Sequence, residues 1–114
     1  MGKSSRDKGK RGERELAQEL RRLGCQSARR AQQYCGSESS ADLLGIPGIH
    51  IECKRTEALS LYTAYEQAKK DSVGSSDIPV VIHRRNHHPW VVIMGLDDWF
   101  QMYHAYRNTQ LPSS

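Results

Sequence analysis

Cysteine is scarce in this 114-residue sequence, and long apolar runs are missing. The three cysteines (Cys25, Cys35 and Cys53) are an odd number without a C-x-x-C pair, which argues against a disulfide framework and favours a reduced, cytoplasmic setting. No apolar run approaches the roughly 20 residues that cross a bilayer, and none follows the Lys/Arg-rich start as in a signal peptide. We therefore expect a soluble intracellular protein without a membrane partner.

The chain also has no internal repeat and no linker-like segment, and its length allows one domain. Multi-domain machines, receptors and repeat arrays are excluded. Hydrophobic residues make up 37% of the chain and charged residues 26%, with a mean hydropathy of −0.73, so the core is thin. We expect a flexible basic arm over 1–8, one folded domain over 9–106 and a tail over 107–114.

Acidic residues are few at the start of the chain. Residues 1–30 contain ten basic and four acidic side chains, a net charge of +6, whereas the other 84 contain seven basic and nine acidic ones, a net charge of −2. A basic leading third suggests a polyanionic partner, most simply nucleic acid. The alternative is a basic terminus that only keeps the protein in solution.

Hydrophobic spacing predicts an α/β fold with the order α-β-β-α-β-β-α, a mixed sheet flanked by helices. The first helix ends at Gly24, and in the last helix we expect Trp99, Phe100 and Tyr103 to face the core. The predicted helices cover 12–23, 60–70 and a segment from 97 to about 106, and the predicted strands cover 41–46, 49–55, 78–83 and 90–94.

Acidic residues occur where a buried strand normally carries apolar ones. Asp42 lies in the apolar run 41–46, and Glu52 and Lys54 share one face of the alternating run 49–55. A carboxylate on a central strand needs a compensating cation, and hard oxygen ligands suit Mg²⁺, with Mn²⁺ as a substitute. With Glu13 on the first helix, these residues predict metal-assisted phosphodiester hydrolysis. The alternative is an exposed edge strand that carries a cross-strand ion pair.

The turn between the two strands decides whether Asp42 and Glu52 can act together. A two-residue loop at Pro47-Gly48 would put Asp42 on the face of Cys53. A three-residue loop over 46–48 would pair Asp42 with Glu52. Because Pro-Gly favours a type II turn, which fits a two-residue hairpin poorly, we expect an odd-length loop or a bulge.

The series Asp42, Glu52-Cys53-Lys54 resembles the core of the PD-(D/E)XK nucleases, although Ala41 stands where the family has its nominal proline. The helix Lys10-Arg11-Gly12-Glu13-Arg14-Glu15 resembles that of archaeal-type and phage Holliday junction resolvases. The resemblance covers about residues 8–94 and implies a restriction-endonuclease-like fold and a prokaryotic, archaeal or phage-infected host. It also implies catalytic roles for Glu13, Asp42, Glu52 and Lys54, and a metal held by Asp42, Glu52, Glu13 and the Cys53 carbonyl.

The resemblance further implies a branched or four-way junction as the DNA substrate, and a homodimer that cuts it twice. Candidate dimer surfaces are the runs 78–82 and 91–94 or the last helix. Arg84 and Arg85 could contact phosphate or lie in a solvated loop; zinc at His83, His87 and His88 is disfavoured because the ligand spacing is absent. The candidate DNA-binding residues are Lys8, Lys10, Arg11, Arg14, Arg29, Arg30, Ser37, Ser39, Gln67, Arg84 and Arg85.

Two other functions fit the same residues. The first is another PD-(D/E)XK enzyme of the nicking, repair or restriction type. The second is a non-catalytic DNA-binding module on the same scaffold, although such a module would not need to keep Asp42, Glu52 and Lys54.

Overall fold

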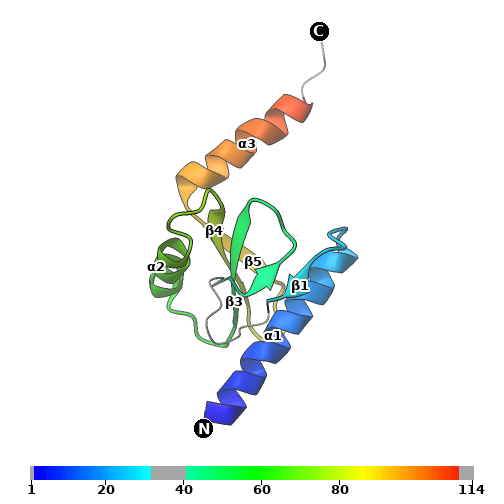
Figure 1. Cartoon of the computed structure of the whole chain (residues 1–114), viewed down its shortest axis with the longest axis vertical. Coiled ribbons are helices and arrows are strands. Elements are labelled where there is room, and N and C mark those ends of the chain that lie inside the picture. Colours follow the sequence, from blue (N-terminus) through cyan, green and yellow to red (C-terminus); the bar gives the residue numbers. More distant parts are fainter. Residues whose placement is uncertain (1, 32–40, 111–114) are drawn as a thin grey trace.

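The chain forms a five-stranded sheet with helices on both of its faces, as seen in a computed structural model that describes residues 2–31 and 41–110 (Figure 1). The sheet order is β1-β2-β3-β4-β5, with β3 and β4 parallel and all other neighbours antiparallel. The elements in chain order are α1 (Gly2–Arg22), β1 (Arg29–Arg30), β2 (Leu43–Leu44), β3 (Ile49–Arg55), α2 (Leu61–Asp71), β4 (Ile78–Arg84), β5 (Val91–Met94) and α3 (Leu96–Gln110).

The mixed α/β architecture predicted from the sequence is confirmed. Helix α2 connects the parallel strands β3 and β4, as a parallel pair requires a crossover. Helix α1 covers one face of the sheet, where Leu16 packs with Leu43, Ile51 and Val80. Helix α2 covers the other face, where Ala68 packs against Val81. The middle of β3 is therefore buried on both sides, and any polar group there needs a partner.

Several boundaries differ from the prediction. Helix α1 begins at Gly2 rather than Gly12, so the Lys/Arg-rich segment expected as an arm is the first part of this helix. The mobility of residues 1–8 stays a prediction. Helix α3 likewise continues to Gln110, into the expected tail. The strand predicted over 41–46 is only Leu43–Leu44, and β1, which has just two basic residues, was missed.

The last helix departs most from expectation. Helix α3 points away from the sheet at the end of the molecule opposite the N-terminus (Figure 1). Trp99, Phe100 and Tyr103 are 48%, 45% and 38% exposed, so the prediction that they face the core is wrong. The physical reason is that α1 and α2 already cover the two faces of the sheet, and α3 leaves from the edge strand β5.

None of the helices in the described part of the chain is long and apolar enough to span a membrane. The run 78–82, expected as a possible dimer surface, lies in β4, and Val80, Val81 and Ile82 are buried within the chain. That run is therefore not available to a second copy.

Candidate functional site

The β2–β3 hairpin sets the geometry of the site. Leu43 pairs with Ile51, which is the register of a three-residue loop, and Asp42 just before β2 has its carboxyl group next to that of Glu52. This is the register expected for an odd-length loop, and it is confirmed. Gly45 makes the close turn possible: its φ is +89°, and a Cβ there would lie 1.9 Å from the carbonyl oxygen of Ser27. Only glycine fits this position.

Asp42 is held by its backbone and by its side chain. Its N–H donates to the Ile51 carbonyl (2.8 Å), and its own carbonyl accepts from the Ala31 N–H (2.9 Å). The Cys53 N–H donates to Asp42 Oδ2 at 2.7 Å. Burial raises the pKa of Asp42 above its ordinary value, and the Cys53 N–H and the charge of Lys54 offset part of this effect. The carboxyl group is thus fixed in position and poorly hydrated.

Glu52 lies between two other carboxyl groups. Its carboxyl group hydrogen-bonds with that of Asp42 and with that of Asp71 at the end of α2. Only 6% of Glu52 is exposed. Burial first, and the negative charges of Asp42 and Asp71 next, raise its pKa to about 8. Adjacent buried carboxylates repel one another, so Glu52 keeps its proton to a higher pH than an exposed glutamate does.

His50 and Asp71 join this cluster, and the sequence reasoning missed both. His50 Nε2 lies 3.3 Å from Glu52 Oε1, and ligand atoms of His50, Glu52 and Asp71 all lie within 4.8 Å of one another. A signal for His50 was present, since it precedes Glu52 by two residues and therefore shares its face of β3. Asp71 gave no such signal, because only the packing of α2 on the sheet brings its carboxyl group here.

Gln67 is connected to the cluster through Asp71. Its Nε2 donates to Asp71 Oδ1 and Oδ2 at 2.9 and 3.0 Å, one helical turn along α2. Gln67 therefore orients a carboxylate of the candidate site. A direct contact between Gln67 and DNA stays a prediction.

Lys54 and Glu13 lie on opposite flanks of the cluster. Lys54 is half-buried on β3, and its charge lowers the pKa of both Asp42 and Glu52. Glu13 accepts a 2.8 Å hydrogen bond from Arg30 Nε. Burial and then the charge of Asp42 raise the pKa of Glu13, against the effect of Arg30. Glu13 is therefore electrostatically coupled to Asp42, from the α1 side of the sheet.

Cys53 faces the packed side, as expected. It lies among the residues of the α1-side core, and burial raises the pKa of its thiol far above the ordinary value. A thiolate nucleophile is therefore excluded at this position. The implied role of Cys53, as a backbone carbonyl ligand, stays a prediction.

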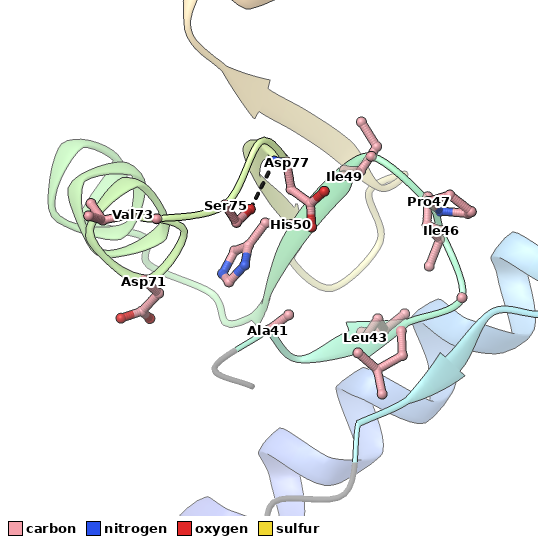
Figure 2. Close-up of a pocket in the computed structure, with 14 residues that line it drawn as sticks. Ala41, Leu43, Ile46, Pro47, Ile49, His50, Asp71, Val73, Ser75 and Asp77 are labelled. Atoms are coloured by element: carbon pink, nitrogen blue, oxygen red, sulfur yellow. Dashed lines mark hydrogen bonds between the residues drawn. The ribbon is translucent and has the colours of Figure 1, made fainter. Parts of the chain in front are cut away.

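A pocket of about 660 Å³ opens beside the cluster, between the β2–β3 loop and the loop that follows α2. His50 and Asp71 lie on its inner side, and the Pro47 turn and Asp77 lie at its rim (Figure 2). The Asp77 N–H donates to Ser75 Oγ at 2.8 Å and closes the second loop (Figure 2). His50 and Asp71, the members of the cluster that line the pocket, thus have a route to solvent.

Some of the candidate DNA-binding residues form ion pairs within the chain, and others are exposed. Arg84 pairs with Glu15, which ties β4 to α1, and Arg30 pairs with Glu13. Ser37, Ser39 and the side chain of Lys8 lie outside the part that the structure describes. The exposed members are Lys10, Arg11, Arg14, Arg29, Gln67 and Arg85.

A comparison with protein families now adds to this geometry. Residues 4–113 match the model of a family described as "Phage putative PDDEXK endonuclease". The chain belongs to this family. The match supports the assignment to the PD-(D/E)XK superfamily and places the protein among endonucleases. It does not confirm the resemblance to Holliday junction resolvases. No curated protein and no solved structure matches the chain.

Membership of the PDDEXK endonuclease family gives the cluster a chemical context. Asp42, Glu52 and Lys54 stand in the order of the family signature, on the hairpin that brings the two carboxyl groups together. His50 and Asp71 extend this set on the side of the pocket.

Proposed function

We propose that this member of the PDDEXK endonuclease family is a divalent-metal-dependent DNA endonuclease that selects branched DNA, with a Holliday junction as the preferred substrate. The observation that carries the proposal is the convergence of Asp42, Asp71 and His50 on Glu52, in a buried position beside a pocket.

The donor set fits a divalent cation. Three carboxyl groups and one imidazole converge here, and the charge of Lys54 on β3 opposes those of Asp42 and Glu52. Carboxylate oxygens suit Mg²⁺ and Mn²⁺, and an imidazole ligand favours Mn²⁺ over Mg²⁺. Asp42, Glu52 and Asp71 would hold the ion, with His50 as a further ligand and Glu13 as support from α1. A bound cation would lower the pKa of Glu52, which burial and the neighbouring carboxyl groups raise to about 8.

A bound divalent ion supplies Lewis acidity, which activates water and neutralises charge on the phosphate. The residues of the chain do the positioning. Lys54, beside Asp42 and Glu52, would orient the attacking water and stabilise the charge that develops on the phosphate oxygen. The Cys53 N–H and Gln67 fix the carboxyl groups of Asp42 and Asp71, so that they need not reorganise during the reaction.

The proposed substrate follows from the surface. Lys10, Arg11 and Arg14 are exposed on one side of α1 and would contact phosphates, which position DNA without reading its bases. Contacts of this kind suit recognition of DNA shape. A four-way junction requires two symmetric cuts, so the proposal includes a homodimer.

A cleavage assay tests the proposal with a four-way junction, a flap and a linear duplex of matched sequence. We expect Mg²⁺ or Mn²⁺ to support cutting, with the junction cut fastest and EDTA abolishing activity. Asp42→Asn should lower the rate at least 100-fold, because it removes a carboxylate that the metal needs. Glu66→Gln is the matched control, since Glu66 is an exposed acid on α2.

Each outcome has a definite meaning. Equal cutting of junction and duplex would replace junction selectivity with the nicking, repair or restriction type of activity. Equal rates for wild type and Asp42→Asn, or no cutting with either metal, would overturn the enzymatic proposal and leave the non-catalytic DNA-binding module.

A further inference from the structure

Helix α3 is a 15-residue helix that packs on no face of the sheet. Every residue from Trp99 to Thr109 is exposed, and the helix projects from the body along the 60 Å long axis of the molecule (Figure 1). A helix of this length is marginal in water by itself, and most helical stability in proteins comes from tertiary packing. Its apolar side chains therefore need a surface that covers them.

The spacing of the apolar residues shows what kind of surface fits. Leu96, Trp99, Tyr103 and Tyr106 follow one another at intervals of three, four and three residues. This is the a/d spacing of a helix that packs against another helix. Trp99 stacks on Tyr103 with ring centroids 5.5 Å apart, so the aromatic side chains already form a continuous stripe.

Within the described residues, no other helix has an uncovered apolar face that could pack against α3. The apolar stripe of α1 packs against β2, β3 and β4, and the small stripe of α2 packs against Val81. DNA is also a poor match, since α3 carries Asp97 and Asp98 and only one Lys or Arg, Arg107. The helix that covers α3 therefore comes from another molecule.

We propose that α3 pairs with α3 of a second copy of this chain as an antiparallel two-helix seam. In each copy the sheet with α1 and α2 lies at the N-terminal end of α3 (Figure 1). An antiparallel pair therefore keeps the sheets of the two copies at opposite ends of the helix pair. It can bring Trp99 opposite Tyr103 of the second copy, and Leu96 opposite Tyr106. Opposed helix macrodipoles add a small favourable contribution.

The exposed apolar area of α3 approaches what a stable dimer needs. The exposed apolar side chains of α3 are 38–74% exposed: Leu96, Trp99, Phe100, Met102, Tyr103 and Tyr106. Large apolar side chains of about 150–250 Å² each, here roughly half exposed, make the patch about 600 Å² per copy. A standard interface buries about 800 Å² per partner. The α3 pair rests on these observations and not on the proposed junction cleavage.

Sedimentation equilibrium of the full chain over the micromolar range tests the pairing. The wild type should have about twice the 13.0 kDa mass of one chain. The double variant Trp99→Ala/Tyr103→Ala should weaken association at least tenfold and sediment as a monomer. Tyr62→Ala is the matched control: Tyr62 is 79% exposed on α2, away from the patch, and its loss should leave the dimer intact.

Two further measurements make the outcome decisive. Gln101→Ala changes the polar side of α3 and should leave the sedimentation mass of the dimer unchanged. This control separates loss of the helix–helix contact from loss of the helix itself. Urea unfolding followed at Trp90, in the main core, checks that the double variant still folds. A monomeric wild type, or a double variant that associates as tightly as the wild type, would overturn the proposal; so would a loss of dimer with Tyr62→Ala.

Discussion

At the scale of single residues, the side chain that orients the carboxyl groups of the acidic cluster has the clearest consequences. Gln67 donates to both oxygens of Asp71, and Asp71 in turn shares a hydrogen bond with Glu52. Groups that orient a metal ligand typically contribute 10–100-fold to metal affinity. Gln67 is therefore a positioning residue, although it is exposed.

Gln67→Ala should weaken Mn²⁺ binding by about tenfold, and Asp71→Asn should weaken it further, because the first loses the orientation of the ligand and the second loses its charge. Isothermal titration calorimetry with MnCl₂ measures both effects without an activity assay. Gln18→Ala, an exposed glutamine of α1, should bind as the wild type does. Unchanged affinity in Asp71→Asn would remove Asp71 from the site.

We expect His50 to affect whether the site binds Mn²⁺ or Mg²⁺ more tightly. Because imidazole is a better ligand for Mn²⁺ than for Mg²⁺, His50→Asn should reduce the ratio of Mn²⁺ to Mg²⁺ affinity by about tenfold. The same titration with MgCl₂ supplies the comparison. Equal losses for both ions would show that His50 only supports Glu52.

The raised pKa of Glu52 predicts a dependence of stability on pH. Between its ordinary value and about 8, the folded state binds more protons than the unfolded state, so the metal-free protein should lose stability as pH rises through this window. A divalent ion competes with these protons and should raise Tm more at pH 8.5 than at pH 6. Thermal unfolding in EDTA and in MnCl₂ at the two pH values tests this.

Glu52→Gln is the control for that experiment, because it cannot titrate. Its metal-free Tm should depend less on pH between about 5 and 8 than the wild-type Tm does. The same slope in both proteins would contradict the assignment of the effect to Glu52.

At the scale of the elements, the hairpin is the part that the sequence predicted best. The alternation over 49–55 fixes which side chains share a face, and the odd-length loop follows from the turn chemistry of Pro47-Gly48, so Asp42 opposite Glu52 could be predicted. The position of Asp71 could not, because it depends on how α2 packs across the sheet. The exposure of Trp99 could not be predicted either. The spacing of apolar residues in a helix is the same whether they pack against their own chain or against another molecule.

The hairpin also gives a stability prediction. Gly45→Ala should destabilise the protein by more than about 2 kcal/mol, since a positive φ costs about 1 kcal/mol or more and the new Cβ would clash with the Ser27 carbonyl. Gly48→Ala is a close control: its φ is +86°, but nothing lies within 4 Å, so about 1 kcal/mol is expected. Urea denaturation measures both values, and equal losses would contradict the close approach at Gly45.

At the scale of the whole molecule, charge is distributed in layers. The exposed cations of α1 lie on one side of the sheet, and the carboxyl groups of Glu52 in β3 and Asp71 in α2 lie near the other. The modest net charge of +4 thus combines a basic face with a buried acidic cluster, and bound metal would cancel part of the latter.

This arrangement predicts how DNA binding responds to salt. Lys10→Ala and Arg14→Ala should each weaken binding for all sequences and reduce the slope of log K against log salt by about 1. Lys69→Ala, on α2 and paired with Glu66, should leave the slope unchanged. Fluorescence anisotropy at several NaCl concentrations measures the slopes, and a flat response in the wild type would exclude phosphate contacts by α1.

The acidic cluster has one more property, which concerns folding kinetics. His50, Glu52, Asp42 and Asp71 all come from one continuous stretch of 30 residues, a hairpin followed by a helix. The loops that bring these residues together are short, so their closure costs little chain entropy compared with docking α1 on the sheet. The candidate site is therefore encoded in a local unit that can assemble early, before α1 finds its place on the sheet.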